Sequence, residues 1–166
     1  MTELIKPQLG DKCFDPACGT FGFMIAANRY VNAHNDMYAL SDRQADFQQN
    51  KAFNGVELVH ETHRLALMNA YLHNMNANIT LGDSLAQSAK GLKDFDVILT
   101  NPPFGTKKGG ERATRDDISF QTSNKQLNFL QVIYRSLKAD ARPAAPWYCR
   151  IMCCLLQVTV PACAGN

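Results

Sequence analysis

The residues best suited to chemistry lie in four short segments, each of which follows an apolar run typical of a β-strand. They are residues 15–22 (DPACGTFG), Glu57, Asp83 and residues 101–104 (NPPF). In open α/β sheets, ligands bind beyond the carboxyl ends of the strands. Polar signals after four successive strands therefore predict one ligand site along that edge of a sheet.

The first two segments could each hold part of a ligand. Small residues in the first segment, among them Ala17, Gly19, Thr20 and Gly22, let backbone amides approach a ligand, and the following helix offers its N-terminus. Glu57 is placed to accept hydrogen bonds from a pair of hydroxyls such as a ribose diol.

The fourth segment is suited to a planar amine. Asn101 offers an amide oxygen, Pro102 and Pro103 remove competing backbone donors, and the ring of Phe104 can stack on a planar base. When the Asn101 side-chain oxygen and the Pro102 carbonyl accept both amino protons, the nitrogen moves toward tetrahedral geometry and its lone pair is freed for attack. The alternative for this tetrapeptide is a rigid turn with a half-buried Phe104.

The elements that position these segments alternate between strands and helices, as in an α/β domain with a largely parallel sheet. The expected strands are residues 12–15, 55–58, 78–81 and 95–100, and the expected helices are residues 22–35, 41–53, 61–76 and 124–138. This order places every chemical segment at the end of a strand or just after it.

Two of the expected helices have apolar residues at helical spacing. Leu65, Met68, Leu72 and Met75 share one face, which should lie on the sheet as part of the core. In the last helix the same spacing places Leu127, Leu130, Tyr134 and Leu137 on one face. Ser123 and Gln126 are expected to form a capping box at the start of this helix.

Composition places the chain among single globular domains. It has 17 Lys+Arg, 15 Asp+Glu and a net charge of +2, so any contact with nucleic acid must be local or supplied by a partner. The most apolar run, residues 151–160, is far shorter than the roughly 20 residues that cross a bilayer. The N-terminus lacks the pattern of a secretory signal. We therefore expect a cytoplasmic protein with reduced cysteines and no membrane span.

The last part of the chain differs in composition from the rest. Residues 141–166 hold four of the six cysteines and the only Trp, whereas all 15 acidic residues fall in residues 1–140. We expect residues 1–140 to form the domain core and residues 141–166 to be an atypical tail of the kind that a shifted reading frame produces. The sheet should end at the strand 95–100 or gain an edge strand from residues 151–160.

Two other features have simpler interpretations. His60 and His63 flank Glu61 without the HExxH spacing, and the cysteines of the tail lack a matching pair, so no metal site is expected. Four basic residues follow Phe104 and are offset by three acidic ones, which predicts either a solvated loop or a contact with phosphate. The basic residues are Lys107, Lys108, Arg112 and Arg115.

Five motifs occur in a fixed order within about residues 4–140: DPACGTFGFM, GVELVHETHRLALMN, LGDSL, FDVILTNPPFGTKKGG and SNKQLNFLQVIYRSLK. Together they resemble the methyltransferase (modification, M) subunit of type I restriction-modification systems. The resemblance implies a Rossmann-like core, incomplete in this chain, that transfers a methyl group from S-adenosylmethionine to the adenine amino nitrogen of duplex DNA. It also implies a specificity subunit and a restriction subunit as partners.

The resemblance implies roles for the four segments. The turn of residues 15–22 holds the methionine part of the cofactor, Glu57 the ribose hydroxyls and Asp83 the adenine amine. Residues 101–104 hold a target adenine that is flipped out of the duplex. The cofactor residues are Asp15, Ala17, Gly19, Thr20, Gly22, Glu57 and Asp83, and the catalytic ones are Asn101, Pro102, Pro103 and Phe104.

The sequence departs from the family pattern at Phe21, where the family usually has a small residue, so we expect this side chain to crowd the cofactor. The family has a long helical region before the first strand, for which the residues ahead of residue 12 are too few, and we expect the chain alone not to methylate DNA. Two other functions stay open. One is methylation of another planar amine, in RNA or a protein glutamine, and the other is a catalytically silent binding or assembly remnant.

Overall fold

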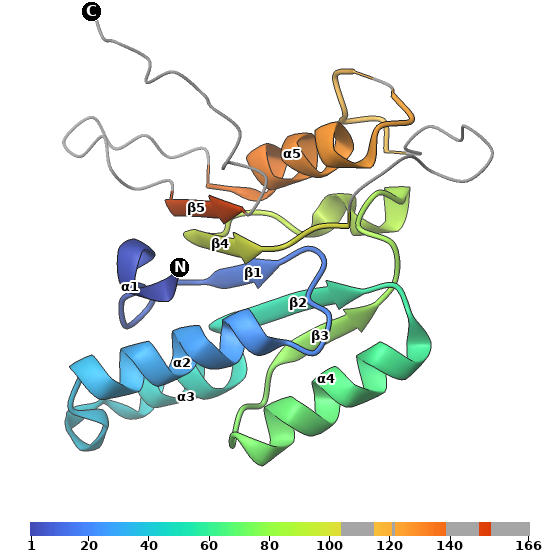
Figure 1. The fold of residues 1–166 in the computed structure, drawn as a ribbon. Coiled ribbons are helices and arrows are strands. Elements are labelled where there is room, and N and C mark those ends of the chain that lie inside the picture. The colour runs from blue at the N-terminus through green and yellow to red at the C-terminus, as the bar shows by residue number, and fades with distance from the viewer. Residues whose placement is uncertain (104–114, 121, 139–149, 154–166) are drawn as a thin grey trace, which may run out of the picture.

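A parallel sheet of five strands forms the centre of the computed structural model, which describes residues 1–103, 115–120, 122–138 and 150–153 (Figure 1). The strand order is β3-β2-β1-β4-β5. The strands are β1 (Cys13–Asp15), β2 (Phe53–Glu57), β3 (Asn78–Leu81), β4 (Val97–Thr100) and β5 (Arg150–Cys153). The expected α/β class with a parallel sheet is confirmed. The sheet does not end at β4. A further strand from the tail, which begins at Arg150, pairs with it.

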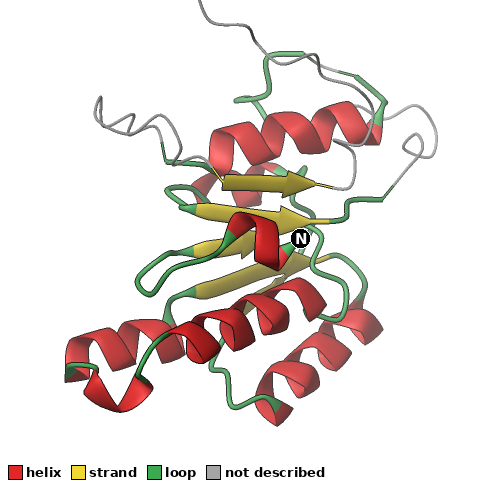
Figure 2. Cartoon of the chain, turned by 60° about the vertical axis from the view of Figure 1, so that its left-hand side comes forward, coloured by secondary structure: helices red, strands yellow, loops and turns green. Residues whose placement is uncertain are grey.

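Helices cover both faces of this sheet (Figure 2). The α-helices are α1 (Thr2–Ile5), α2 (Gly22–His34), α3 (Asp42–Asn50), α4 (His60–Leu72) and α5 (Lys125–Ser136), and two 3-10 turns span Met37–Ala39 and Gln87–Gly91. The helix expected over residues 41–53 ends at Asn50, because the chain enters β2 at Phe53. Among the described residues, no helix is both long and apolar enough to cross a membrane.

Alternate residues of the strands build two cores, because neighbouring side chains of a strand point to opposite faces. On one face Cys13, Phe53, Val97 and Leu99 pack with residues of α2 and α4. On the other face the core contains residues of β1, β2, β4 and α5, namely Phe14, Val56, Ile98, Ile133 and Leu137. The sheet is therefore the middle of three layers, and its strands are fixed from both sides.

The apolar face expected for α4 is not the one that packs on the sheet. Leu65, Met68 and Leu72 are 48%, 54% and 67% exposed, whereas Ala66 and Ala70 are buried. Of the expected face only Met75, beyond the helix end, is in the core. The small alanine side chains let the helix axis come close to the sheet, and the larger residues on the neighbouring face are left outside.

The expectation for α5 is wrong in a similar way. Leu127, Leu130 and Tyr134 are exposed, and of the expected residues only Leu137, at the helix C-cap, is buried. The residues that the helix buries are Asn128, Phe129, Val132, Ile133 and Ser136. Its N-cap is Asn124, whose side-chain oxygen accepts a hydrogen bond from the Leu127 N–H at 3.1 Å, and not the expected pair of Ser123 and Gln126.

Candidate functional site

The chemical segments lie at one edge of the sheet, as their positions after parallel strands predict. Asp15 ends β1 and Glu57 ends β2, which pairs with β1. Asp83 follows β3 by two residues, and Asn101 follows β4 directly. Because β1 lies between β2 and β4, the first turn is flanked by the ends of both. Phe104 lies outside the described residues, so its stacking role stays a prediction.

Glu57 holds the first turn in place. Its Oε2 accepts a hydrogen bond from the Gly19 N–H at 2.9 Å, and its Oε1 accepts one from the Val59 N–H at 2.8 Å. Gly19 has a φ of 53°, a conformation that glycine adopts without strain. Each carboxylate oxygen has a second lone pair, so these bonds leave acceptor capacity for a ligand. The bond between Glu57 and the turn was not predicted from the sequence, since it joins residues far apart in the chain.

The two glycines of the turn have open space beside them. Apart from its chain neighbours and, at Gly22, the backbone of its own helix, a Cβ atom built on Gly19 or on Gly22 would meet no described atom within 4 Å. Thr20 is exposed, and its carbonyl oxygen accepts a hydrogen bond from the Asn69 side chain of α4 at 2.9 Å. The turn is thus held by two neighbouring elements and leaves space in front of its glycines.

Asp15 lies beneath the turn rather than on it. It is 1% exposed, and its Oδ1 accepts a hydrogen bond from the Ala17 N–H at 3.0 Å. Burial raises the pKa of Asp15 to about 7, although the hydrogen bond from the Ala17 N–H stabilises its charged form. Burial is also the main reason for a raised pKa of the Cys18 thiol, to which the charges of Asp15 and Glu57 add.

Phe21 does not crowd the space in front of the turn, so the expectation for this residue is wrong. Its backbone is left-handed, with a φ of 70°, and its side chain is fully buried in the core with Met24. The ring packs against β2 at Gly55, where a Cβ would lie 2.9 Å from Phe21 Cε2 and 3.0 Å from Cys18 Sγ. A glycine in the strand thus makes room for the large side chain of the turn.

The loop after β3 is tied to the first turn. Asp83 is partly exposed, and its Oδ1 accepts a hydrogen bond from the Leu85 N–H at 2.8 Å. The hydroxyl of the buried Ser84 donates to the carbonyl oxygen of Pro16 at 2.6 Å. The loops that carry Asp83 and Asp15 are therefore in direct contact.

The start of the fourth segment is accessible. Asn101 and Pro103 are exposed, whereas Pro102 is buried against the domain. All four residues of the preceding strand, β4, are buried, so Asn101 is the first exposed residue after a firmly packed strand. An exposed side-chain amide that follows a packed strand can form hydrogen bonds with a ligand.

Arg115 itself fits neither of the two alternatives given for the loop that follows. It is 1% exposed and forms an ion pair with Asp117, so it is neither solvated nor free to contact phosphate. The other three basic residues of that loop, Lys107, Lys108 and Arg112, lie outside the described residues.

His63 has a structural contact. Its Nε2 lies 3.0 Å from the carbonyl oxygen of Ile79, which joins α4 to the edge strand β3. Within the described ranges, no group of three or more His, Cys, Asp or Glu side chains is arranged to hold a metal ion.

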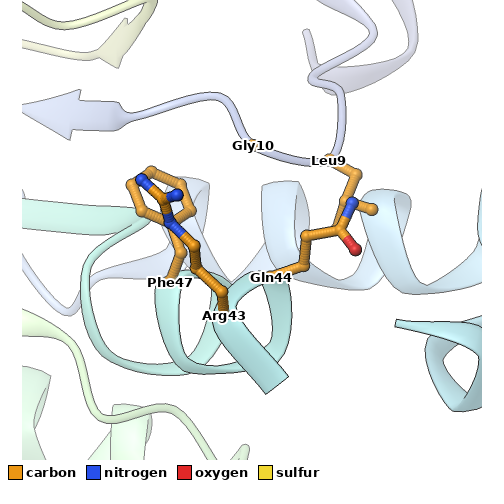
Figure 3. A pocket seen from close by; sticks show the side chains of 5 residues that line it. All are labelled: Leu9, Gly10, Arg43, Gln44 and Phe47. Carbon is orange, nitrogen blue, oxygen red and sulfur yellow. The ribbon is translucent and has the colours of Figure 1, made fainter. Parts of the chain in front are cut away.

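A small pocket lies away from these segments. Figure 3 shows it between Leu9 and Gly10, which precede β1, and three residues of α3, Arg43, Gln44 and Phe47. None of the predicted site residues lines it. The strand ends, with their carboxylates and open glycines, are therefore the better candidate for the functional site.

Comparison with known proteins identifies relatives of this arrangement. A family model described as N-6 DNA Methylase matches residues 1–145. The StySPI type I restriction enzyme methylase subunit of Salmonella potsdam is 45% identical over 150 residues, which is 86% of this chain and 28% of that protein. The EcoKI methylase subunit of Escherichia coli K12 is 43% identical over 149 residues, again 86% of this chain and 28% of that protein.

The fold comparison agrees with the sequence comparison. The crystal structure of the EcoKI M protein matches with a TM-score of 0.75 and 44% identity, over 81% of this chain and 29% of that one. A putative class I S-adenosylmethionine-dependent methyltransferase of Listeria monocytogenes, 19% identical, shares the fold with a TM-score of 0.52 over 82% of this chain and 39% of that one. The chain thus spans less than a third of the length of its curated relatives.

Proposed function

Since the chain belongs to the N-6 DNA methylase family, we propose that it forms the ligand-binding part of a DNA adenine-N6 methyltransferase, the modification subunit of a type I restriction-modification system. The observation that carries this proposal is the placement of Glu57, Asp83 and Asn101 at neighbouring strand ends around one open glycine turn. A cofactor and a target base can then meet at one edge of the sheet.

S-adenosylmethionine is the proposed cofactor. The residues fit it, because the space in front of Gly19 and Gly22 is open and two partly exposed carboxylates, of Glu57 and Asp83, border the same edge. We assign the methionine part to the turn of residues 15–22, the ribose hydroxyls to Glu57 and the adenine amine to Asp83. When bound, the cofactor supplies an electrophilic methyl group.

The proposed target is the exocyclic amine of an adenine that leaves the duplex. Asn101 is exposed at the end of a buried strand, so its side-chain oxygen can accept one amino proton while the Pro102 carbonyl accepts the other. This pair of acceptors directs the nitrogen lone pair toward the methyl donor. Phe104 is proposed to stack on the base.

The proposed partners are duplex DNA, a specificity subunit and a restriction subunit. The net charge of +2 supports this assignment, because a chain with so little excess positive charge depends on other surfaces to hold DNA. A cytoplasmic location is part of the same proposal, since the substrate is cellular DNA.

A chimera tests the proposal. Residues 1–145 replace the matching segment of the EcoKI methylase subunit, and the product is combined with its specificity subunit. We expect transfer of tritiated methyl groups to adenine in target duplexes, and loss of this transfer in the chimera with Asn101→Ala, while cofactor affinity stays within about twofold. A folded chimera that binds cofactor and methylates equally well with Asn101→Ala would refute the role of this residue.

A further inference from the structure

Arg115 is the largest fully buried side chain in the part of the chain that the structure describes, and it is charged. Its Nε and Nη2 donate to the two carboxylate oxygens of Asp117 at 2.9 and 2.7 Å, a bidentate pair. These hydrogen bonds lower the pKa of Asp117. A pair two residues apart in sequence satisfies the charge locally, but it does not use the whole guanidinium group.

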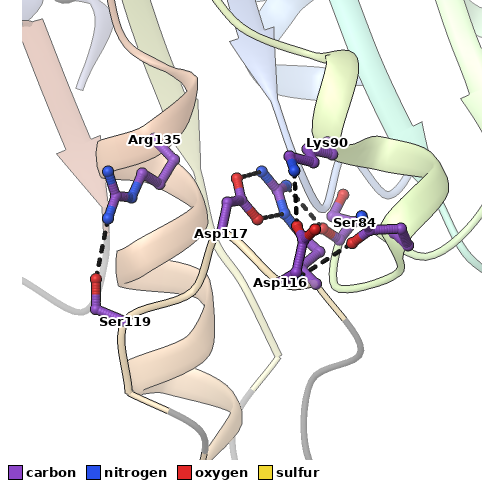
Figure 4. Close-up of polar contacts among 8 residues, drawn as sticks. Ser84, Lys90, Asp116, Asp117, Ser119 and Arg135 are labelled. Carbon is purple, nitrogen blue, oxygen red and sulfur yellow. Dashed lines mark hydrogen bonds and ion pairs between the residues drawn. The ribbon is translucent and has the colours of Figure 1, made fainter.

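The third nitrogen of Arg115 reaches another loop. Its Nη1 donates to the carbonyl oxygen of Ser84 at 3.2 Å (Figure 4). Ser84 follows Asp83 directly, and its hydroxyl donates in turn to the carbonyl of Pro16, which follows Asp15. Arg115 is thus the start of a chain of hydrogen bonds that joins the segment after β4 to the loop after β3 and the turn after β1.

Two further contacts fasten the segment around Arg115 to the loop after β3. The Asp116 N–H donates to Gln87 Oε1 at 3.1 Å, and the Asp116 carboxylate pairs with Lys90 at 2.8 Å. Both partners lie in the 3-10 turn Gln87–Gly91, a few residues after Asp83.

An apolar cluster lies in the same region and joins the same three loops to α5. It contains Leu85 from the loop after β3, Ile118 from the segment of Arg115, and Phe129 and Val132 from α5. Ala17 of the first turn packs against it. The loops that carry the proposed cofactor residues are therefore held by one buried apolar cluster and one buried cation.

We propose that Arg115 is a positioning residue that fixes the Asp83 loop against the Asp15 turn and so prepares the cofactor site. The proposal rests on the proposed function, because the cofactor assignment of Asp83 and the turn comes from it. Arg115 does not touch the cofactor in this proposal. It acts through the Ser84 carbonyl, to which its Nη1 donates.

A paired replacement separates this role from a contribution to stability alone. In the variant with Arg115→Met and Asp117→Leu both charges are removed together, and such replacements of buried ion pairs are often neutral or stabilising. The midpoint of thermal unfolding should stay close to that of the wild type. The Ser84 carbonyl, however, loses the hydrogen bond from Arg115, even if the new apolar side chains pack well.

Two measurements on the full 166-residue chain follow from this design. Amide hydrogen exchange without ligand reports on the Leu85 and Ala17 N–H groups, which donate to Asp83 and Asp15. We expect both amides to exchange about tenfold faster in the paired variant, and the Kd for S-adenosylmethionine, measured by calorimetry, to rise about tenfold. Arg135→Met is the matched control, because this exposed arginine donates to Ser119 in the same region without contacting Ser84 (Figure 4).

Each outcome decides the proposal. Unchanged exchange of Leu85 and Ala17 in the folded paired variant overturns it, and so does faster exchange with unchanged cofactor affinity. Equal effects in Arg135→Met overturn it as well, because they would show a general loosening. If the wild-type chain binds no S-adenosylmethionine, the proposed cofactor fails, and exchange at the two amides still decides whether Arg115 holds the loops together.

Discussion

Glu57 combines two tasks in one carboxylate. Both of its oxygens accept backbone N–H groups, from Gly19 and Val59, and the proposed function gives it the ribose hydroxyls as additional donors. Because a carboxylate only accepts hydrogen bonds when ionised, it gathers donors from the protein and from a ligand without repulsion. Glu57 thus holds the turn and, in the proposed function, accepts hydrogen bonds from the ribose hydroxyls.

The substitution Glu57→Ala is expected to weaken binding of S-adenosylmethionine by about ten- to hundredfold. The reason is the loss of charge-assisted acceptors, which contribute about 1.5 to 3 kcal/mol. Titration calorimetry measures the affinity, and Glu61→Ala is the control, since this residue lies in the first turn of α4 and has no proposed role in binding. A folded Glu57→Ala variant with wild-type affinity would show that the assignment is wrong.

The buried Asp15 is expected to make the stability of the chain depend on pH. Its pKa is raised by burial to about 7, so the folded state holds a proton that the unfolded state has already lost. The contribution of this group to the free energy of unfolding is full at low pH and falls as the pH rises from about 4 to about 7. Urea unfolding at a series of pH values measures it.

Asp15→Asn removes the titrating group, so the difference in unfolding free energy between the wild type and this variant should change between pH 4 and 7 and level off above. A difference that stays constant across this range would contradict the raised pKa. His34→Gln is the comparison variant, since His34 is exposed at the end of α2 and its loss leaves Asp15 untouched.

At the scale of elements, a large side chain of the first turn packs against a glycine of β2. Phe21 fills the space that Gly55 leaves, and the two come from different elements. We expect Gly55→Ala to lower the free energy of unfolding by about 1 to 3 kcal/mol, because the added Cβ forces Phe21 or Cys18 to move. Urea unfolding gives the value.

Adding Phe21→Leu to Gly55→Ala should restore part of the loss. Gly91→Ala is the matched control, since a Cβ there would meet no atom within 4 Å. If Gly55→Ala and Gly91→Ala had equal effects, the close packing of Phe21 on β2 would not be the cause.

The helix α4 provides a second test at this scale. Leu72 is exposed and Ala66 is fully buried, so Leu72→Lys should change the free energy of unfolding by less than about 0.5 kcal/mol, whereas Ala66→Leu should lower it by about 1 to 3 kcal/mol. Both variants are measured by urea unfolding. The reverse order of effects would mean that the larger apolar face packs on the sheet after all.

At the scale of the whole molecule, the outer faces of α4 and α5 carry large exposed apolar side chains. They include Tyr71 and Leu72 on α4 and Leu127 and Tyr134 on α5. Exposed apolar patches of this kind promote association. The chain spans 28% of the length of the StySPI methylase subunit, so these faces lie on a segment that in its relatives belongs to a much larger protein.

We expect the isolated chain to associate as its concentration rises, and the variant with Tyr71→Lys and Leu72→Lys to associate less at equal concentration. Sedimentation velocity over a range of about 5 to 200 μM measures this, a range in which proteins with exposed apolar surface commonly aggregate. Replacing the exposed polar residue Glu61 by Lys is the control. A strictly monomeric wild-type chain would contradict the prediction.

Local sequence patterns were enough to predict the parallel α/β fold and the end of the sheet at which the chemical residues gather. Strand composition is a local property, and parallel pairing brings the carboxyl ends of the strands to one edge, so Asp15, Glu57, Asp83 and Asn101 were predicted to lie at the same edge. The family resemblance added narrower roles to these positions, and the membership in the family is confirmed.

Which surfaces are buried depends on contacts that form when the chain folds. Periodicity finds an apolar face on α4, but the smaller residues Ala66 and Ala70 are the ones that pack on the sheet, and their size lets the helix lie close to it. Phe21 turns into the core because Gly55, far away in sequence, leaves room for it. Arg115 can be buried because its guanidinium group donates to the Asp117 carboxylate and to the Ser84 carbonyl. Burial depends on contacts between distant segments, and local sequence patterns do not contain that information.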